Sequence, residues 1–293
     1  MGDLKEYRFA SSPAEAVALL RRGPGRGAYI AGGTDLLRAR PDCDFVVDVN
    51  HAGIGAIDLR PEGDLFLGAA ATVLGAGRDE RVRGFAGGAL AEALSACALR
   101  SGRPTATVGG RLCHGGCGGN LAPVLLVLDA SCVIADEATT TNLPLSRFYR
   151  PDGGTVLADR LLAGVALPGT ARLRRCLCQR HARCIGGEPL AQVAVGLDVV
   201  ENRVVTVRIG IGAATTAPGR ALLAEAVLTG LDPRAVGPDQ VHECGGTAAA
   251  EIVPIDDHQA SAEYRRDLVA GLVGRLVSRA LAWQETPEPE RYA

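Results

Sequence analysis

AGGTD, residues 31–35, lies between a short apolar strand predicted over residues 28–31 and a helix expected to begin near Leu36. Two adjacent glycines allow the backbone to approach a ligand closely, and successive N–H groups can then point at an anion beside a favourable helix dipole. The stretch is neither the dinucleotide fingerprint G-x-G-x-x-G nor a Walker loop, which needs a lysine that this stretch lacks. Alone, it is more typical of a tight turn between a strand and a helix.

A second glycine pair lies in TVGGR, residues 107–111, after a predicted helix at 90–99 and a basic turn at 100–103. The pyrophosphate of a dinucleotide is best bound by donors from more than one direction. Two such loops in one chain therefore favour a phosphate-bearing ligand over two unrelated turns.

The composition describes a globular protein of 293 residues, long enough for two ordinary domains. Hydrophobic residues make up 47% and charged residues 22%, which excludes disorder as the main state. The net charge of -2 argues against a nucleic-acid binder, which needs a basic field. No apolar stretch resembles a secretory signal or a membrane span, so we expect a cytoplasmic protein whose nine cysteines are free thiols, core residues or ligands.

Local signals predict most of the regular elements and a domain boundary near residues 168–172, where proline and glycine interrupt the pattern. Ser12 and Glu15 form a capping-box pattern that predicts a helix at 13–22. Alternating apolar residues, beginning with Val205, predict a half-buried strand at 205–211. The other expected elements are strands at 45–49, 64–68 and 132–135 and helices at 121–129 and 219–229.

The last predicted helix covers residues 261–283 and begins at a Ser261 cap. Its apolar side chains recur at helical spacing, and its arginines are expected on the opposite, exposed face. The apolar set is Tyr264, Leu268, Leu272, Val273, Leu276, Val277 and Leu281, and the arginines are Arg265, Arg266, Arg275 and Arg279.

Six short segments follow one another over residues 31–266. They are AGGTDL (31–36), TVGG (107–110), LLVLDA (125–130), Leu161-Leu162 through Leu167-Pro168, APGR (217–220) and ASAEYRR (260–266). In this order they resemble the FAD-binding medium subunit of the molybdenum hydroxylases, a family that includes the flavin subunits or domains of carbon monoxide dehydrogenase and xanthine dehydrogenase. Each segment alone is a weak signal, whereas the ordered set covers nearly the whole chain.

This resemblance implies an α+β fold, in which a two-subdomain FAD-binding (PCMH-type) fold precedes a C-terminal α+β domain of the carbon monoxide dehydrogenase flavoprotein type. Carried onto this sequence, it implies an FAD-binding domain at 1–170 and a C-terminal domain at 171–293. The first domain would consist of subdomains at about 1–57 and 58–170, with FAD bound between them.

The resemblance also implies that the chain binds FAD and passes electrons from iron–sulfur clusters to an external acceptor, such as NAD. The implied partners are a molybdopterin-binding large subunit and a 2Fe-2S small subunit, with no nucleic acid and no membrane. The cofactor carries the chemistry, so no catalytic side chain and no protein-bound metal is expected. The implied cofactor-binding residues are Ala31, Gly32, Gly33, Thr34, Asp35, Thr107, Val108, Gly109, Gly110, Arg111, Asn120 and Arg183, with the backbone N–H groups of both loops and the Thr34 hydroxyl near the phosphates and ribityl chain.

Several positions depart from the family pattern. Arg111 directly follows the second glycine pair, where the family usually has Asn. Asn120 stands where the family's Asp would bind FAD, and an amide can form hydrogen bonds but brings no charge. Gln179 stands where a Lys often lies near the flavin, while Arg183 still offers a cation that could stabilise the reduced flavin. These differences predict a flavin potential that can differ from that of the family.

Cys113, His114 and Cys117 lie in the loop expected to run past the flavin. We interpret the thiols as small fillers of a glycine-rich loop and His114 as a solvated histidine. The alternatives are a covalent bond to the flavin and a redox pair that acts with a substrate.

Cys176, Cys178, His181 and Cys184 have side chains of the types that bind metals, but their spacing matches neither zinc pairs nor a ferredoxin run. On a strand, the first two would share one face, which predicts core thiols.

Arg220 is expected to form a structural salt bridge.

Two other functions stay open. The chain could be a stand-alone FAD-dependent oxidoreductase that acts directly on a small molecule, with its pocket shaped by the loop at 111–120. It could also be a non-enzymatic binding or assembly module that has lost FAD. The departures at Arg111 and Asn120 motivate both alternatives. Colourless purified protein would favour the second, and the absence of neighbouring genes for partner subunits would favour the first.

Overall fold

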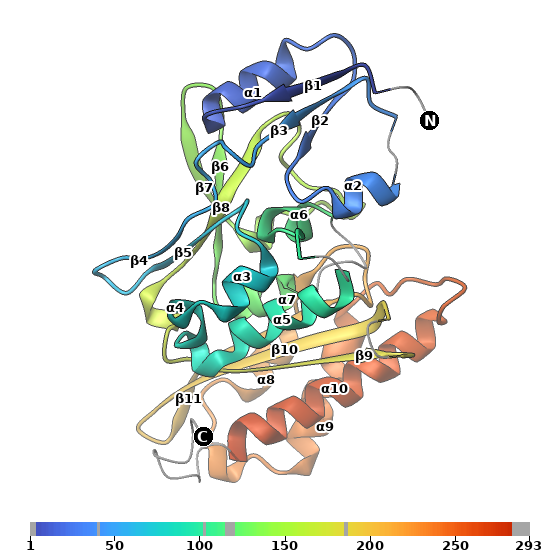
Figure 1. Cartoon of the computed structure of the whole chain (residues 1–293). Coiled ribbons are helices and arrows are strands. Elements are labelled where there is room, and N and C mark those ends of the chain that lie inside the picture. The colour runs from blue at the N-terminus through green and yellow to red at the C-terminus, as the bar shows by residue number, and fades with distance from the viewer. Residues whose placement is uncertain (1–3, 40–41, 102–103, 115–120, 185–186, 283–293) are drawn as a thin grey trace.

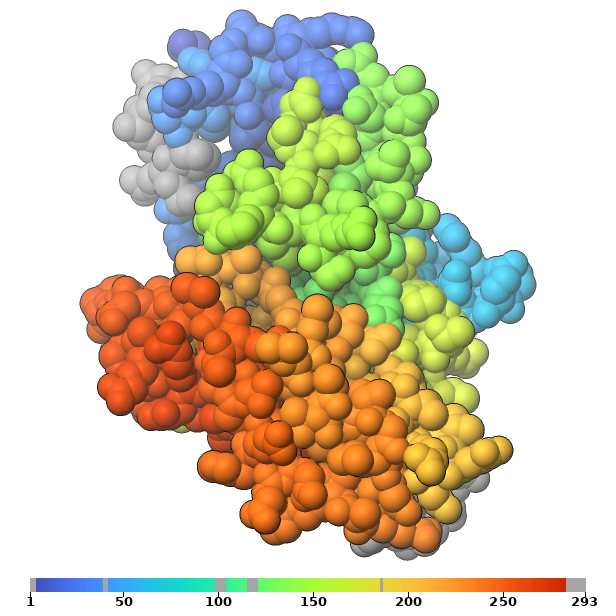
Figure 2. Space-filling view, turned by 180° about the vertical axis from the view of Figure 1, so that it is seen from behind, coloured from blue at the N-terminus to red at the C-terminus, as the bar shows by residue number. Residues whose placement is uncertain are grey.

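The structure is a computed structural model and describes residues 4–39, 42–101, 104–114, 121–184 and 187–282. Its strands form three sheets, which follow one another from the N-terminal to the C-terminal part of the molecule (Figure 1). Helices and strands are mixed throughout the chain, which confirms the predicted α+β class. The view from behind shows the yellow-green middle of the chain between the blue N-terminal part and the orange C-terminal part (Figure 2).

The first sheet is parallel and has the order β1-β3-β2. Parallel strands require crossover connections, and helices lie in both of them: α1 between β1 and β2, which flank β3, and α2 between the neighbours β2 and β3. The elements are β1 (Glu6–Phe9), α1 (Pro13–Arg21), β2 (Gly27–Ile30), α2 (Thr34–Ala39) and β3 (Phe45–Asp48).

The cap of α1 is confirmed in part. The Ser12 hydroxyl accepts a hydrogen bond from the Glu15 N–H at 3.2 Å, as an N-cap does. The Glu15 carboxylate accepts from the Ser11 N–H at 2.8 Å instead of from Ser12, so the reciprocal half of the predicted capping box is displaced by one residue.

The second sheet is antiparallel and has the order β4-β5-β8-β6-β7. Within the described residues, five helices and two 3-10 turns lie between its strands. The strands are β4 (Ile57–Leu59), β5 (Leu65–Gly68), β6 (Ser131–Ala135), β7 (Thr140–Pro144) and β8 (Leu161–Leu167). The helices are α3 (Val73–Arg78), α4 (Glu80–Arg83), α5 (Ala89–Ser101), α6 (Val108–Cys113) and α7 (Ala122–Val127), with 3-10 turns at Ala86–Gly88 and Leu145–Arg147.

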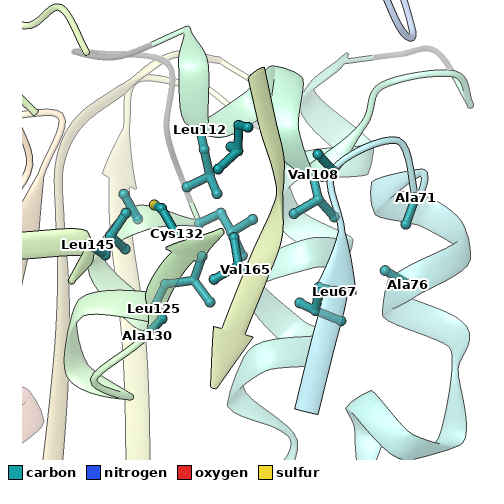
Figure 3. Packing of buried hydrophobic residues seen from close by; sticks show 14 of the residues in the cluster. Leu67, Ala71, Ala76, Val108, Leu112, Leu125, Ala130, Cys132, Leu145 and Val165 are labelled. Carbon is teal, nitrogen blue, oxygen red and sulfur yellow. The ribbon is translucent and has the colours of Figure 1, made fainter. Parts of the chain in front are cut away.

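The first two sheets share one hydrophobic core, which contains buried side chains from both. In the close view, Leu67, Val165 and Cys132 project from three strands of the second sheet toward side chains of α6 and α7 (Figure 3). All six residues of α7 are buried, which agrees with the buried helix predicted there. The core therefore fixes α6, the helix that begins with the second glycine loop.

The third sheet is antiparallel and has the order β12-β11-β10-β9. Its own core lies between this sheet and the helices α8, α9 and α10, which cover one face (Figure 1). The elements are a 3-10 turn (Gly169–Ala171), β9 (Arg175–Ala182), β10 (Pro189–Val200), β11 (Arg203–Gly212), β12 (Gly219–Arg220), α8 (Leu222–Leu228), a 3-10 turn (Pro233–Ala235), α9 (Pro238–Glu251) and α10 (Ala262–Ala282).

The other face of the third sheet packs directly on α7 at two glycines. A Cβ added at Gly210 would lie 2.4 Å from the Pro123 carbonyl oxygen, and one added at Gly196 would lie 2.4 Å from Cγ1 of Val127. Such contacts are too short for real atoms, so only glycine permits this close approach.

Two sequence predictions for the third sheet need correction. Val205 does not face the core with the other apolar residues of β11, because it is 50% exposed while Val204 is fully buried. The register between β10 and β11 shifts at this point, where Asp198 pairs with Thr206 but Val199 pairs with Val204, so Val205 is the extra residue of a bulge. The helix predicted at 219–229 begins only at Leu222, since residues 219–220 form β12.

Arg265 is the third correction, because it is buried rather than exposed on α10. Its guanidinium donates to the carbonyl oxygens of Leu190 and Ala213 and pairs with Asp257 at 2.8 Å. Leu190 lies on β10, Ala213 directly follows β11, and Asp257 lies between α9 and α10. Arg265 therefore joins the helix to the sheet. Tyr264, assigned to the apolar face, is instead 45% exposed.

Candidate functional site

The two glycine loops meet at one cavity. A volume of about 260 Å³ is lined by residues 29–36 of the first loop and by residues at the start and end of α6, among them Thr107, Gly110 and His114. A second cavity of about 270 Å³ adjoins it and shares Tyr29, Ala31, Gly110 and Cys113. The second cavity is walled largely by apolar residues, including Val49, Ile54, Leu157, Leu161 and Leu162.

Glycine is required at both positions of the first pair, for different reasons. A Cβ at Gly32 would lie 1.8 Å from the Thr105 carbonyl oxygen, so this residue lets the first loop contact the segment before the second. Gly33 has φ +68°, in the left-handed region that side chains disfavour. The loop therefore depends on glycine for close approach and for its turn.

The N–H groups of residues 32–36, in the first loop, point to no acceptor within the part of the chain that the structure describes. The loop itself is held from behind, since Asn50 Nδ2 donates to the Ala31 carbonyl at 3.1 Å and to Asp48 Oδ1 at 2.9 Å. Successive N–H groups at the wall of a cavity form a concave site for an anion.

The second loop is arranged differently. The N–H groups of Val108 and Gly109 donate to the carbonyls of Ala71 and Ala69, at 2.9 and 2.8 Å. The Gly110 N–H donates to the Thr107 hydroxyl, which caps α6, at 3.2 Å. The structure thus uses within the protein the N–H groups that the sequence assigned to the phosphates. The second loop therefore forms one wall of the cavity and packs closely against the neighbouring segments.

An ion pair joins the two loops. Arg111 Nη1 lies 3.0 Å from Asp35 Oδ2, and the two side chains are 3% and 17% exposed. Arg38 on α2 approaches the other oxygen of Asp35 at 3.4 Å, although 58% of its side chain is exposed. Arg38 also lies 3.5 Å from Nε2 of His114 and 3.5 Å from Glu188. Charged side chains therefore connect both loops with the third sheet at the rim of the cavity.

The remaining predicted positions are placed less centrally. Arg183 follows β9, is exposed, and lines neither of the two cavities described above. Asn120 and Cys117 lie outside the described residues, so their predicted roles rest on sequence alone. Gln179 lies on β9 opposite Val193 of β10.

Cys113 lines both cavities, whereas the other described thiols do not line them. Although the residue is accessible to solvent, desolvation raises the pKa of its thiol to about 12, so it is protonated near neutral pH. A protonated thiol is a poor nucleophile, which favours the interpretation of Cys113 as a filler over a covalent bond to a ligand.

Cys176 and Cys178 lie on one face of β9 and pack against the core, as the strand pattern predicted. Gln192 Nε2 donates to the Cys178 sulfur at 3.2 Å. Desolvation raises the pKa of the Cys178 thiol to about 12. Within the described residues, no group of three His, Cys, Asp or Glu side chains is placed to hold a metal ion.

Sequence reasoning missed the residues that support the first loop. Asp48 is the last residue of β3, and Asn50 follows it by two positions. Asn50 Nδ2 donates to the Ala31 carbonyl and to the Asp48 carboxylate, and the Tyr7 hydroxyl donates to the same carboxylate. The signal that could have revealed them is the pair of polar residues at the end of an apolar strand, since ends of parallel neighbouring strands meet at one sheet edge.

Comparisons with known proteins agree on one family. Residues 3–170 match the family described as "FAD binding domain in molybdopterin dehydrogenase", and residues 188–280 match the "CO dehydrogenase flavoprotein C-terminal domain". The chain is also similar to the nicotine 6-hydroxylase medium subunit of Paenarthrobacter nicotinovorans, with 30% identity over 179 residues, 61% of this chain and 62% of that relative. The match thus spans about three fifths of the length of the curated relatives.

Solved structures show the same fold. Carbon monoxide dehydrogenase from Hydrogenophaga pseudoflava has a chain that superposes with a TM-score of 0.89 at 23% identity, covering 96% of this chain and 99% of its own. Quinoline 2-oxidoreductase from Pseudomonas putida 86 gives a TM-score of 0.84 at 24% identity, covering 95% and 97%. Separately, none of the helices in the described ranges has the length and apolar character needed to cross a membrane.

Proposed function

Because this chain belongs to the family of FAD-binding domains in molybdopterin dehydrogenases, we propose that it is the medium subunit of a molybdenum hydroxylase type complex. In this function it holds FAD and passes electrons from iron–sulfur clusters through the flavin to an external acceptor. FAD supplies the redox chemistry, because it exchanges electrons singly or in pairs, and the protein supplies binding, orientation and electrostatics.

The observation that carries the proposal is the row of N–H groups at residues 32–36. Residues 32–36 line a cavity, and their N–H groups face no protein acceptor among the described residues, so a diphosphate would satisfy several unpaired donors at once. Thr34 adds a hydroxyl at the same wall. The N–H groups of residues 34–36 belong to the first turn of α2, where a helix has no acceptors of its own, so they are available to an anion in the cavity.

The adjoining apolar cavity supports a ligand with an extended, ring-bearing body. Its aliphatic walls, including Leu157, Leu161 and Leu162, exclude water and offer contact area to a flat ring. Tyr29 borders both cavities and is held by a 2.8 Å hydrogen bond from its hydroxyl to the Asp159 carbonyl. The protein thus offers a polar wall for phosphates next to an apolar wall for a ring, which is the pattern of a dinucleotide.

The proposal includes the partners that the family implies: a molybdopterin-binding large subunit, a 2Fe-2S small subunit and NAD or another acceptor. The three sheets support the division into subdomains at about 1–57 and 58–170 and a C-terminal domain from residue 171. The free state of the eight described cysteines supports a reducing compartment such as the cytoplasm. Arg183 stays proposed as a cation near the flavin.

The first test is the visible absorption spectrum of the purified chain, before and after acid denaturation. We expect a flavin spectrum, or its appearance on adding FAD, and release of all the yellow colour on denaturation, since the Cys113 thiol is protonated. Failure to bind FAD in excess would favour the module that has lost FAD. Colour that stays on the protein after denaturation would contradict non-covalent binding.

The partner question needs a separate experiment. A tagged chain, expressed with the genes that flank its own, should co-purify with a subunit that contains molybdenum and one that contains iron and sulfide, both detected by elemental analysis. Purification of an FAD-loaded chain without partners, together with reduction of its flavin by a small molecule, would instead favour a stand-alone oxidoreductase.

A further inference from the structure

An acidic residue lines the cavity where we propose a diphosphate. Asp35 lines this cavity beside the N–H groups of the first loop. A carboxylate repels a diphosphate, so Asp35 alone would oppose the ligand that these N–H groups attract. We propose that the Asp35–Arg111 ion pair sets the charge of this cavity and thereby its affinity for the diphosphate of FAD. The inference rests on the proposed FAD-binding function.

The geometry of the pair supports this role. Arg111 Nη1 donates to Asp35 Oδ2 at 3.0 Å, and the Arg111 side chain is only 3% exposed. Water and salt screen such a pair less than a surface pair, so its charges act strongly on each other and on a nearby ligand. Asp35 is among the residues that line the cavity, whereas Arg111 is not. The main effect of Arg111 on an anion in the cavity is therefore to cancel the charge of Asp35.

Arg38 cannot fully replace Arg111. Its Nη2 lies 3.4 Å from the other Asp35 oxygen, but 58% of its side chain is exposed, and its Nη1 lies 3.5 Å from Glu188. Solvent screens the contact between Arg38 and Asp35, and the Glu188 carboxylate offsets part of the positive charge of Arg38. Arg111 is consequently the principal compensating cation among the described residues around Asp35.

The pair also links cavity charge to loop assembly. Asp35 follows the first glycine pair, whereas Arg111 directly follows the second and lies within α6. Arg111 can pair with the Asp35 carboxylate only when the two loops are in contact. The close approach of Gly32 to Thr105 provides this contact. The sequence departure at Arg111 thereby acquires a role together with Asp35.

Two single substitutions should change affinity in opposite directions. Asp35→Asn keeps the size of the side chain and removes the negative charge that pairs with Arg111, so the dissociation constant for ADP should fall about tenfold. Arg111→Gln leaves a carboxylate beside the diphosphate, so the constant should rise by about tenfold or more. The double variant Asp35→Asn/Arg111→Gln is neutral at both positions and should bind ADP within about threefold of the unsubstituted protein.

The experiment uses the full-length chain freed of flavin and titrated calorimetrically with FAD, ADP and adenosine. Adenosine lacks phosphate, so its affinity should not respond to any of these charges. Asp42→Asn and Arg26→Gln are matched controls, because this exposed pair at 3.3 Å changes net charge equally but lies away from the cavity lining. Thermal unfolding of each apo variant reports its folding independently of binding.

The outcomes separate the inference from the function beneath it. Opposite shifts for ADP, with unchanged adenosine binding, would support the charge role. Weakened ADP binding in both single variants would show that the pair acts only by holding the loops, and would overturn the inference. If Arg111→Gln does not fold, the other two variants still test the charge role: Asp35→Asn should bind ADP more tightly, and the double variant should return to the ADP affinity of the unsubstituted protein. An unsubstituted chain that binds neither FAD nor ADP would instead contradict the proposed function.

Discussion

Gly32 carries the contact between the two loops on which the candidate site depends. Its φ is ordinary, so the need for glycine arises only from space: an added Cβ would lie 1.8 Å from the Thr105 carbonyl oxygen and 2.7 Å from its carbon. Both atoms belong to the backbone and cannot rotate away. A methyl group there would have to push the two segments apart.

We expect Gly32→Ala to weaken FAD binding by more than about tenfold and to lower the free energy of unfolding by about 1–3 kcal/mol, because overpacking displaces the backbone. Fluorescence quenching of added FAD and chemical denaturation measure the two effects. Gly55→Ala is the matched control, since a Cβ there meets nothing within 4 Å. Equal behaviour of the two variants would mean that the loops tolerate separation.

Arg265 determines how α10 is joined to the third sheet. The helix begins at the Ser261 cap as predicted, with the Tyr264 N–H donating to the Ser261 hydroxyl at 3.2 Å. One turn later, Arg265 is 1% exposed and donates to two buried carbonyl oxygens and one carboxylate. These acceptors would lose their partner if the guanidinium were removed.

Arg265→Gln should therefore lower the free energy of unfolding by about 3 kcal/mol, because buried acceptors and the Asp257 carboxylate are left unsatisfied. The neighbouring exposed Arg266→Gln has the same chemistry without burial and should change it by less than about 0.5 kcal/mol. Urea denaturation followed by circular dichroism measures both. Similar losses of unfolding free energy in the two variants would show that the buried contacts of Arg265 do not stabilise the protein.

The sequence predicted the elements that have local signals and missed those defined by their neighbours. Capping residues located α1 and α10, and apolar runs located β3 and β5, within a few residues. β10 (Pro189–Val200) was missed because both of its faces are buried over nine residues, so its apolar run lacks the period of a half-exposed strand. The bulge at Val205 depends on pairing with β10 and has no local signature.

The candidate site was predictable to a similar extent. The two glycine loops were located from the sequence, because both glycine pairs are visible in it, the first after an apolar strand and the second after a helix and a basic turn. Which loop keeps free N–H groups was not, since the partners of Val108 and Gly109 lie at residues 69–71 and are set by tertiary packing. The Asp35–Arg111 pair spans 76 positions and likewise needs the fold to be seen.

Asp129 connects the FAD-binding region with the third sheet. Asp129 is the acidic residue of the segment LLVLDA (125–130). It adopts φ +52°, which Asp tolerates better than most side chains. Its two oxygens receive Arg174 at 2.7 Å and Arg208 at 3.0 Å, and Arg220 lies at 3.7 Å. Arg220 also pairs with Glu225, which confirms the predicted salt bridge.

Three arginines of the C-terminal part thus converge on one carboxylate behind α7. Burial alone would raise the pKa of Asp129, but the hydrogen bonds from Arg174 and Arg208 outweigh it and hold the pKa below the ordinary value. A carboxyl whose pKa is lower in the folded than in the unfolded state adds stability above its unfolded pKa of about 3.9. This contribution is lost as the pH falls through the lower, folded pKa.

Asp129→Asn should accordingly lower the free energy of unfolding by about 1–3 kcal/mol at pH 7, because Arg174, only 6% exposed, loses a charged partner. The difference from the unsubstituted protein should shrink as the pH falls below 4 and through the lower folded pKa of Asp129, because the carboxyl then becomes neutral. Urea denaturation across this range measures it, and the exposed Asp267→Asn on α10 serves as control. A difference that stays constant from pH 7 to pH 2 would show that Asp129 acts through shape and neutral hydrogen bonds, and that charge does not hold the third sheet against α7.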